Sequence, residues 1–339
     1  MEKILVTGGA GFIGSAFVRN MLNWYKDVYI VNLDKLTYAG NLDNLKGIDE
    51  ERHTFIHGDI CDYEVVAKAL EGCDYVVNFA AETHVDRSLM RGAVDFLRTN
   101  IEGVYQLLSI GKEKKNIKKI VLISTDEVYG SRDEGSAVET DPVNPRNPYS
   151  VSKCAGELMG LAFYYSFHLP VVITRGCNTY GPYQYPEKVL PLFITNALEN
   201  KPLPLYKGGE HNIRDWLYVD DHCKAIDLIM REGEPGHIYN ISAGFEKQNI
   251  EVTKKVLELT GKDESLIQWV PDRPGHDKRY SMNSDKIRKL GWNPLVSWEE
   301  GIERTVKWYK ENEWWWKKIK EGEFREYYRK QYIDRTEKT

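Results

Sequence analysis

The chain has 339 residues, of which 42% are hydrophobic and 29% are charged, and its formal net charge is −5 at pH 7. This composition is ordinary for a globular protein, with enough apolar residues for one large domain or two modest ones. The slightly acidic balance, without a basic stripe, argues against nucleic acid as the main partner. No apolar run approaches the roughly 20 residues that span a bilayer, so no membrane partner is expected.

Short apolar runs alternate with helical patterns along the chain. The predicted strands lie at residues 3–7, 28–34, 53–59, 74–80, 119–124, 170–175 and 237–242. The predicted helices lie at residues 12–25, 62–70, 88–114, 149–167, 187–200, 220–232, 249–260, 284–290 and 298–312. Most of the strands lack polar alternation, which is typical of a parallel sheet covered by helices on both faces. The pattern predicts an α/β fold with a doubly wound parallel Rossmann sheet.

The pattern changes after residue 176, where proline and glycine increase and the elements become shorter. We interpret this part as a smaller C-terminal domain, interleaved with the first because the late strand at 237–242 should return to the main sheet. The predicted boundaries assign residues 1–182 with 220–248 to the first domain and residues 183–219 with 249–339 to the second. The aromatic tail from residue 314 onward is expected to be a helix packed on the surface.

The cysteines are scattered along the chain, and no two of them form a C-x-x-C pair: Cys61, Cys73, Cys154, Cys177 and Cys223. They predict reduced thiols in a cytoplasmic protein, because neither a disulfide framework nor a metal site has this spacing. A strand begins at residue 3, so no signal peptide is expected before the fold.

A glycine-rich turn follows the first predicted strand and opens the first helix. Gly8 permits the tight turn, Gly11 lets the backbone approach a pyrophosphate, and Gly14 allows close packing of helix on strand. The amide groups at the helix start would hold the phosphates. Asp34 ends the second strand, 20 residues after Gly14. It can accept hydrogen bonds from the adenosine ribose and would repel a 2′-phosphate, which favours NAD over NADP, although Lys35 weakens this preference slightly.

Two further strand ends should line the same crevice. Asp59 could lie beside the adenine, or it could serve as the N-cap of the helix that begins near Tyr63, and both roles remain open. Residues 79–83 could run along the cofactor toward its nicotinamide.

Tyr149 and Lys153 share one face of a predicted helix because they are four residues apart. A free phenol has a pKa of about 10 and is a poor base, but a nearby ammonium and an oxidised nicotinamide both favour the phenolate. The pair is therefore a candidate general base for an alcohol that loses hydride to NAD. Thr125, at the end of the fifth strand, would hydrogen-bond and orient the substrate oxygen.

These motifs and several longer stretches resemble the dTDP-glucose 4,6-dehydratases, a family of extended short-chain dehydrogenases/reductases that act on nucleotide sugars. The longer stretches are LDKLTYAGNLDNL, NFAAETHVDRS, STDEVYG, NTYGPYQYPEKVLPL, IRDWLYVDDH and RPGHDKRY, and the resemblance covers essentially the whole chain. It implies that the first domain binds NAD and retains it, and that the second domain binds dTDP-glucose. It also implies a homodimer, in which the helices near 88–114 and 149–167 pair with their copies.

The adjacent acids Asp126 and Glu127 indicate more than a simple dehydrogenase or 4-epimerase. Oxidation of the hexose at C4 makes the C5 hydrogen acidic and turns the C6 hydroxyl into a β leaving group. By the resemblance, Glu127 removes the C5 proton and Asp126 protonates the departing hydroxyl, after which the hydride returns to C6. Asp126 must be protonated when it acts, which predicts a raised pKa.

The resemblance and the motifs together name the expected binding residues. The expected NAD contacts are Gly8, Gly11, Phe12, Ile13, Gly14, Asp34, Lys35, Thr37, Asp59, Ile60, Phe79, Ala80, Ala81, Thr99, Tyr149, Lys153 and Thr179. The expected substrate contacts are Thr83, Thr125, Asn178, Lys188, Val189, Pro204, Leu205, Tyr206, Arg214, Asn249, His276, Arg279 and Tyr280. Arg214 and Arg279 would hold the pyrophosphate, because the guanidinium fork matches phosphate oxygens.

Two positions depart from the family pattern, and one histidine suggests a different site. Thr179 stands where relatives carry a second Asn, which places its cofactor contact in doubt. Thr83 replaces a common Ser and keeps the hydroxyl. His84 has no second His or Cys at ligand spacing, so no metal is expected.

Three alternatives remain at this point. The enzyme could be a 4,6-dehydratase of UDP-, GDP- or CDP-sugars, since the base pocket argues only modestly for dTDP. It could be a nucleotide-sugar 4-epimerase, against which the two acids argue. A non-catalytic NAD-binding regulator would be expected to lose Tyr149, Lys153 or the acids, and all of these are present.

Overall fold

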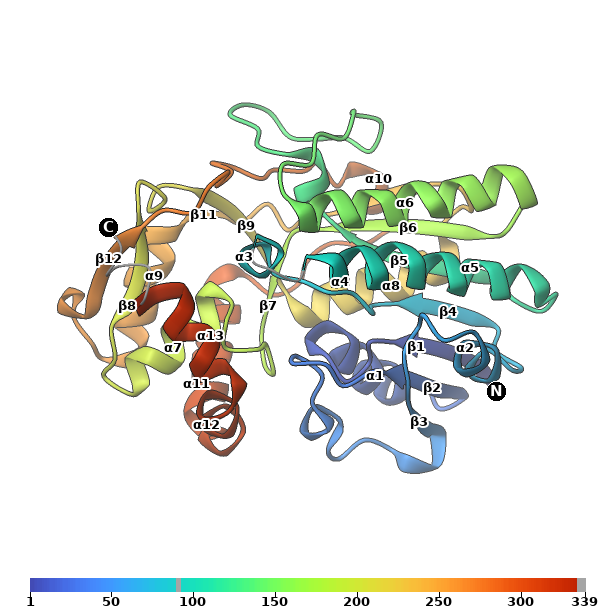
Figure 1. Cartoon of the computed structure of the whole chain (residues 1–339), viewed down its shortest axis with the longest axis horizontal. Helices are drawn as coiled ribbons and strands as arrows, with labels where there is room; N and C mark the ends of the chain where they lie inside the picture. The colour runs from blue at the N-terminus through green and yellow to red at the C-terminus, as the bar shows by residue number, and fades with distance from the viewer. Residues whose placement is uncertain (90–92, 334–339) are drawn as a thin grey trace.

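The structure, a computed structural model, describes residues 1–89 and 93–333 (Figure 1). Its main sheet has seven strands in the order β10-β6-β5-β4-β1-β2-β3, and every neighbouring pair is parallel. The strands are β1 (Glu2–Thr7), β2 (Val28–Asp34), β3 (His53–His57), β4 (Tyr75–Asn78), β5 (Lys119–Thr125), β6 (Val171–Gly176) and β10 (Ile238–Ile241). The predicted doubly wound α/β sheet is confirmed, and the predicted strand at 237–242 does return to its edge beside β6.

The strands of this sheet bury both faces, as the lack of polar alternation predicts. In β5, Val121 and Ile123 belong to one core cluster, whereas Ile120 and Leu122 belong to the cluster on the opposite face. Successive side chains of a strand point to opposite faces, so a strand covered on both sides must be apolar throughout.

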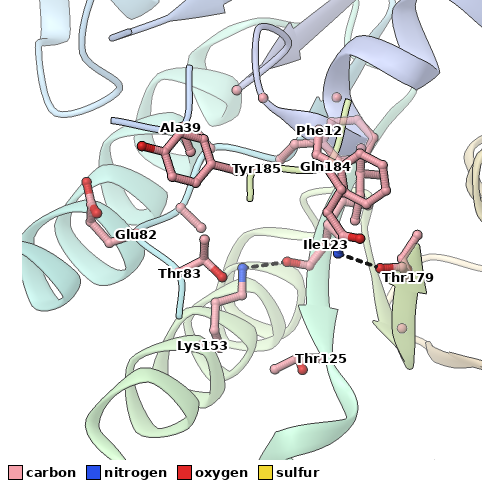
Figure 2. A pocket seen from close by; sticks show the side chains of 18 of the residues that line it. Phe12, Ala39, Glu82, Thr83, Ile123, Thr125, Lys153, Thr179, Gln184 and Tyr185 are labelled. Atoms are coloured by element: carbon pink, nitrogen blue, oxygen red, sulfur yellow. Dashed lines mark hydrogen bonds between the residues drawn. The ribbon is translucent and has the colours of Figure 1, made fainter. Parts of the chain in front are cut away.

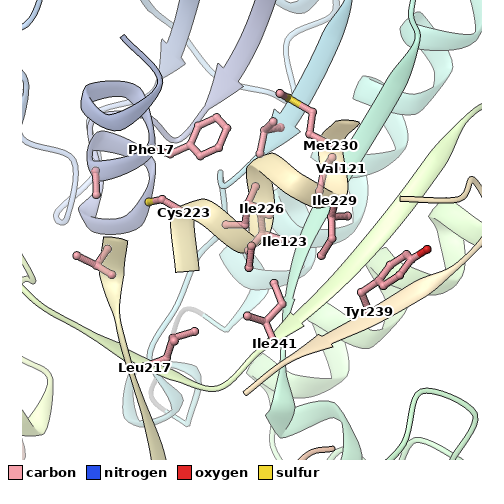
Figure 3. Close-up of a cluster of buried hydrophobic side chains, with 14 of the residues drawn as sticks. Phe17, Val121, Ile123, Leu217, Cys223, Ile226, Ile229, Met230, Tyr239 and Ile241 are labelled. Atoms are coloured by element: carbon pink, nitrogen blue, oxygen red, sulfur yellow. The ribbon is translucent and has the colours of Figure 1, made fainter. Parts of the chain in front are cut away.

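Helices α1 (Phe12–Trp24) and α8 (Val219–Glu232) cover one face. Figure 3 shows Phe17 of α1, Ile226 of α8 and Val121 of β5 within the same buried cluster. Helix α8 lies far along the chain, so this layer already joins the N-terminal part to residues beyond 218.

The opposite face is covered by α2 (Tyr63–Ala69), α5 (Val104–Glu113) and α6 (Pro148–Phe167). Figure 1 shows α5 and α6 running alongside each other over the sheet. The single helix predicted for residues 88–114 is wrong in the described part of that span. It is divided into α3 (Val85–Ser88), α4 (Val94–Leu97), a π-helical turn over 98–103 and α5, and residues 90–92 lie outside the described residues.

A second core lies in the part of the molecule drawn at the left of Figure 1. Its strands are β7 (Asn178–Tyr180), β8 (Leu203–Lys207), β9 (Ile213–Tyr218), β11 (Glu246–Gln248) and β12 (Ile267–Pro271). They form a three-stranded sheet, β11-β9-β7, and a two-stranded sheet, β12-β8. None of these short strands was predicted from the sequence.

The helices of this second part are α7 (Val189–Leu198), α9 (Asn249–Thr260), α11 (Trp298–Glu311), α12 (Glu313–Glu321) and α13 (Glu323–Tyr328). Helix α10 (Asp285–Arg288) instead packs against β10, with Ile287 in the core of the main sheet. The aromatic tail is helical as expected, but its placement on the surface is wrong for two of its tryptophans. Trp315 and Trp316 are buried in the second core, whereas Trp314 is exposed. Residues 334–339 of the tail lie outside the described residues.

No helix within the described residues is both long enough and apolar enough to cross a membrane.

Candidate active site

A cavity of about 340 Å³ opens at the carboxyl ends of β1, β2, β4, β5 and β6 (Figure 2). Ligands of doubly wound sheets bind at this edge. Every residue that the sequence predicts to contact NAD lines the cavity, and so do all the predicted catalytic residues. Of the predicted substrate contacts, Thr83, Thr125, Asn178, Lys188 and Val189 also line it.

The glycine-rich turn forms one wall of the cavity. Gly8 has a φ of +69°, and a Cβ added to it would approach the backbone nitrogen of Ala80 to 2.6 Å. A Cβ on Gly14 would lie 2.3 Å from the carbonyl oxygen of Gly8. Helix α1 then begins at Phe12 without a side-chain cap. The open N–H groups at its start are suited to bind phosphate oxygens.

Asp34 ties the end of β2 to this turn. Its carboxylate accepts hydrogen bonds from the backbone nitrogens of Ala10 at 2.9 Å and Leu36 at 2.7 Å. Burial raises the pKa of Asp34, and these two bonds oppose that rise. A carboxylate offers about four lone-pair sites, so Asp34 retains the capacity to accept a ribose hydroxyl.

The predicted adenine end of the cavity contains an ion pair. Lys35 Nζ lies 2.7 Å from Asp59 Oδ2, and Asp59 also accepts from the backbone nitrogen of Cys61. The alternative role of Asp59 as the N-cap of α2 is wrong. Asp62 caps that helix, because its side chain accepts from the backbone nitrogens at positions 64 and 65.

Helix α6 presents the Tyr-x-x-x-Lys pair to the cavity. Asn147 caps the helix by accepting from Ser150 N, and Pro148 occupies its first turn, as is common at helix starts. Lys153 Nζ donates to the carbonyl oxygen of Ile123 at 2.6 Å, which Figure 2 shows. This bond fixes the ammonium at the end of β5, next to Thr125.

The side chains of Thr83 and Thr125 lie near the Tyr149 hydroxyl and act to lower its pKa. Burial raises the pKa of Tyr149, the negative charge of Glu127 adds to the rise, and the two threonine contacts oppose it. Burial lowers the pKa of Lys153 to about 8, against the opposing charge of Glu157. The direction for Tyr149 is opposite to the lowered pKa expected from the nearby ammonium, because burial outweighs the other effects. A further positive charge beside the phenol, such as an oxidised nicotinamide, would lower its pKa.

The two acids occupy a 3-10 turn, η4 (Asp126–Tyr129), directly after β5. Thr125 Oγ1 donates to Asp126 Oδ1 at 3.1 Å and accepts from Glu127 N at 3.3 Å. Asp126 is only 4% exposed, and burial followed by the charge of Glu127 raises its pKa to about 8. Glu127 is less buried, and its Oε2 accepts from Asn147 Nδ2 at 3.2 Å. The raised pKa of Asp126 agrees with the sequence expectation for an acid that must be protonated when it acts.

Basic and phenolic groups from the second part of the molecule face these acids. The charge of Glu127 acts on the pKa values of Lys188, Arg214, Arg273 and Tyr280. The carboxylate therefore lies at the junction between the cofactor cavity and a positively charged region, which is suited to an anionic substrate.

Residues 5–305 match the family model of GDP-mannose 4,6 dehydratase. A dTDP-glucose 4,6-dehydratase of Streptomyces niveus is 47% identical over 324 residues, which cover 94% of this chain and 96% of the relative.

The chain belongs to the dTDP-glucose 4,6-dehydratase family.

A solved structure of DesIV, the dTDP-glucose 4,6-dehydratase of Streptomyces venezuelae, with NAD and TYD bound, has a TM-score of 0.91 and 48% identity. That match covers 94% of this chain and 99% of DesIV. The UDP-glucose 4-epimerase of Thermus thermophilus, solved with NAD, has a TM-score of 0.84 at 32% identity and covers 91% of this chain and 99% of its own. The fold is thus shared with epimerases and does not by itself distinguish the two reactions.

Within this dehydratase-family chain, several predicted substrate contacts do not line the cavity: Pro204, Leu205, Tyr206, Arg214, Asn249, His276, Arg279 and Tyr280. Arg214 nevertheless lies close to the acids, with its guanidinium 4.3 Å from the ring centroid of Tyr280 and donating to the carbonyl oxygen of Asp277 at 2.8 Å. Asn249 donates to the carbonyl oxygen of Gly209.

Arg279 is placed differently from Arg214. Its guanidinium pairs with Glu246 at 2.7 Å and donates to the carbonyl oxygen of Gly135 at 2.7 Å. Because its donors are engaged away from the cavity, the structure does not place Arg279 as the predicted pyrophosphate ligand.

Arg273 is a candidate that sequence reasoning missed. Its guanidinium pairs with Asp86 at 3.0 Å, and Tyr206 donates to the other oxygen of Asp86 at 3.2 Å. His276 lies beside Tyr206, and burial, followed by the charges of Arg273 and Arg214, lowers the His276 pKa to about 4. The stretch RPGHDKRY contained the signal, since Arg273 opens it.

Glu187 and His222 were also missed, although both line the cavity of this dehydratase fold. Glu187 is held by the Tyr38 hydroxyl at 2.9 Å and by Arg87 Nε at 2.7 Å. His222 Nδ1 lies 2.7 Å from Thr179 Oγ1, so the threonine that departs from the family pattern has a buried partner. The stretches PYQYPEK and YVDDH contain these residues, but nothing in their spacing distinguishes them.

A buried ion pair joins helix α6, which carries Tyr149 and Lys153, to strand β6. Arg175 of β6 donates to both oxygens of Glu157, which lies one helical turn after Lys153. The Arg175 guanidinium also lies 4.5 Å from the ring centroid of Tyr129, in the turn of the two acids. The pair therefore connects the redox helix with the acid turn. Among the described residues, no group of three or more His, Cys, Asp or Glu is arranged to hold a metal ion.

Proposed function

We propose that this chain is a dTDP-glucose 4,6-dehydratase that uses bound NAD. The reaction is oxidation at C4, elimination of water across C5–C6 and return of the hydride to C6, which gives dTDP-4-keto-6-deoxyglucose. The observation that carries the proposal is the position of Asp126, buried with a pKa of about 8, beside the Tyr149–Lys153 pair in one cavity. An epimerase needs no such acid, because it expels no hydroxyl.

The residues present fit NAD. The uncapped start of α1 offers N–H groups to a pyrophosphate, and Asp34 offers acceptors to the adenosine ribose. A Cβ at Gly8 or Gly14 would meet the backbone of Ala80 or of Gly8, so these glycines keep the turn tight against the start of α1. When bound, NAD supplies the hydride acceptor for C4 and a positive charge beside Tyr149.

The chain's own groups then divide the proton transfers. Tyr149 takes the C4 hydroxyl proton, Lys153 stabilises the phenolate, and Thr125 orients the substrate oxygen. Glu127 takes the C5 proton once C4 is a ketone. Asp126 gives its proton to the departing C6 hydroxyl, and Glu127 returns a proton to C5 when the hydride returns to C6. The proton that Tyr149 took from the C4 hydroxyl replaces the one that Asp126 gave, so the net loss is one molecule of water. Each of these acid–base roles is typically worth about 10²–10⁴-fold in rate.

We propose that the nucleotide diphosphate lies against the positive region beside Glu127. Lys188, Arg214 and Arg273 supply its charge, and Tyr206 and His276 lie at its outer end. Arg279 is left out because Glu246 holds it. The division of the chain into an NAD-binding and a nucleotide-sugar-binding domain at residues 183, 220 and 249 stays a prediction.

We further propose a homodimer that forms through the helices flanking the redox site. Exposed apolar side chains occur on α4, α5 and α6. They are Val94, Leu97, Tyr105, Val151, Leu158 and Tyr165. A second copy would bury this surface. Sedimentation of the purified protein tests the proposal, which a monomer at micromolar concentration would contradict.

We also propose a cytoplasmic location, since all five cysteines are free thiols.

One assay tests the main proposal. The purified protein is incubated separately with dTDP-, UDP- and GDP-glucose, and the products are analysed by mass. We expect the dTDP sugar to lose one water most rapidly. Intact sugar, or only the 4-epimer, would refute the dehydratase assignment, whereas faster dehydration of UDP- or GDP-glucose would correct the nucleotide alone.

A further inference from the structure

Helix α12, in the aromatic tail, is connected to the glycine-rich turn through a single buried side chain, that of Asn44. Asn44 is 1% exposed and lies in the loop after β2, at the blue end of the chain in Figure 1, whereas α12 lies at its red end. Trp315 Nε1 donates to Asn44 Oδ1 at 2.8 Å, and Asn44 Nδ2 donates to the carbonyl oxygen of Ala10 at 2.8 Å. Trp315 itself is 1% exposed.

Ala10 is held at both of its backbone polar groups. Its N–H donates to Asp34 Oδ2 at 2.9 Å, and its carbonyl oxygen accepts from Asn41 N at 3.0 Å as well as from Asn44. Ala10 occupies the middle of the turn between Gly8 and Gly14. Fixing each residue of such a chain costs about 1–2 kcal/mol of entropy, and glycines lose the most freedom. Bonds from outside the turn therefore keep it in one shape.

The bond from Trp315 to Asn44 is the buried part of this contact. A second link, from Lys318 of α12 to Asp43 at 3.1 Å, lies at the surface, where an ion pair is worth little. The side-chain amide of Asn44 can keep its orientation toward Ala10 only while Oδ1 has a donor, because an unsatisfied buried carbonyl is costly.

We propose that Trp315 and Asn44 are positioning residues that hold the glycine-rich turn in its cofactor-binding shape, so that α12 controls how long NAD stays bound. The inference rests on the NAD site of the proposed function. It links a tail helix of the second core to cofactor retention in the first.

The chain supplies a matched control, since Trp316 is adjacent to Trp315 and fully buried. Trp316 Nε1 also makes one hydrogen bond, to the carbonyl oxygen of Tyr309 at 2.8 Å, which stays within the C-terminal helices. Trp315→Phe and Trp316→Phe thus remove the same group from the same helix, and only the first breaks the connection to Ala10.

The experiment measures the dissociation rate of NAD from purified protein after dilution into excess competing nucleotide, together with the NAD content after dialysis. We expect Trp315→Phe to release NAD about five- to tenfold faster, the effect of one buried hydrogen bond. Trp316→Phe should release it within about twofold of the parent, as expected for a change that touches no part of the cofactor site.

Equal release from Trp315→Phe and the parent would overturn the inference, and so would equally faster release from both tryptophan variants. If Trp315→Phe does not fold, Asn44→Asp tests the same link, since it replaces the donor to Ala10 with an acceptor and should release NAD faster still. A parent protein that binds no NAD would refute the proposed function itself, which is a distinguishable result.

Discussion

The side-chain amide of Asn147 donates to Glu127 Oε2 at 3.2 Å, and the oxygen of the same amide caps helix α6 by accepting from Ser150 N at 2.8 Å. One residue thus couples the acid proposed to take the C5 proton to the helix that carries Tyr149 and Lys153. The side-chain amide of Asn147 therefore fixes the position of Glu127 relative to Tyr149 and Lys153.

Replacing Asn147 separates these two roles. Asn147→Ser keeps an oxygen for the cap but loses the donor to Glu127, so dehydration should slow about tenfold with little loss of stability. Asn147→Ala loses both and should also lower the free energy of unfolding by about 1 kcal/mol. Single-turnover dehydration rates and urea denaturation check the two effects. Equal rates in Asn147→Ser and the parent would contradict the role assigned to the amide.

The raised pKa of Asp126 sets a pH limit on dehydration. The group gives a proton to the leaving hydroxyl, so it works below its pKa of about 8 and fails as the pH rises above that value. The rate of elimination should therefore fall on the alkaline side of about pH 8. Asp126→Asn should lose about 10²–10⁴-fold in rate and should no longer show this limb. A rate that continues to rise at alkaline pH would contradict the assignment.

The same carboxyl should cost stability at neutral pH. In the unfolded chain it ionises from about pH 4, whereas in the folded protein it resists ionisation up to about pH 8. The unfolded state thus binds fewer protons in this window, and stability falls as the pH rises through it. Asp126→Asn should therefore be more stable than the parent at pH 7.5, by on the order of 5 kcal/mol, and equal to it near pH 4. Calorimetry at the two pH values decides.

The buried Glu157–Arg175 pair should set the charge state of Lys153. Lys153 faces Tyr149 and Glu157 on its own helix and the carbonyl oxygen of Ile123 on β5, and Glu157 is the carboxylate that favours its ammonium form. Glu157→Gln should lower the Lys153 pKa below about 8. The rate of C4 oxidation falls at alkaline pH as Lys153 loses its proton. In Glu157→Gln this fall should occur about one pH unit lower.

A second, half-buried ion pair serves as the control for this change. Glu199 pairs with Lys320 far from the cavity, so Glu199→Gln also leaves a buried cation without its partner. We expect Glu199→Gln to lower the free energy of unfolding without shifting the pH–rate profile of C4 oxidation. If both variants shift the alkaline fall of the pH–rate profile equally, the cause is a general loss of stability and not the charge of Glu157.

The strands of the main sheet could be predicted because each is an apolar run with charged or glycine-rich ends. The short strands of the second part could not, since β8 contains Pro204 and β11 has only three residues. The direction in which each side chain points could not be predicted from the sequence either. Trp314, Trp315 and Trp316 are indistinguishable in sequence, and only packing buries the last two.

The candidate site likewise has residues that could be predicted from the sequence and residues that could not. The acid pair and Tyr149–Lys153 were predicted because their chemistry requires adjacency or helical spacing. Arg214 and Arg279 looked equivalent, since each had been expected at the pyrophosphate, yet Glu246 engages only Arg279. Contacts such as Trp315 with Asn44 join residues 271 positions apart, and no local pattern records them.

The place of β10 in the sheet affects how the chain must be made. Strand β6 has β5 on one side and β10 on the other, and residues 238–241 leave the ribosome after most of the chain has been synthesised. Until then the nascent protein carries an unpaired apolar strand edge, which can pair with another chain. A message truncated before residue 238 therefore encodes an aggregating fragment and not a smaller enzyme.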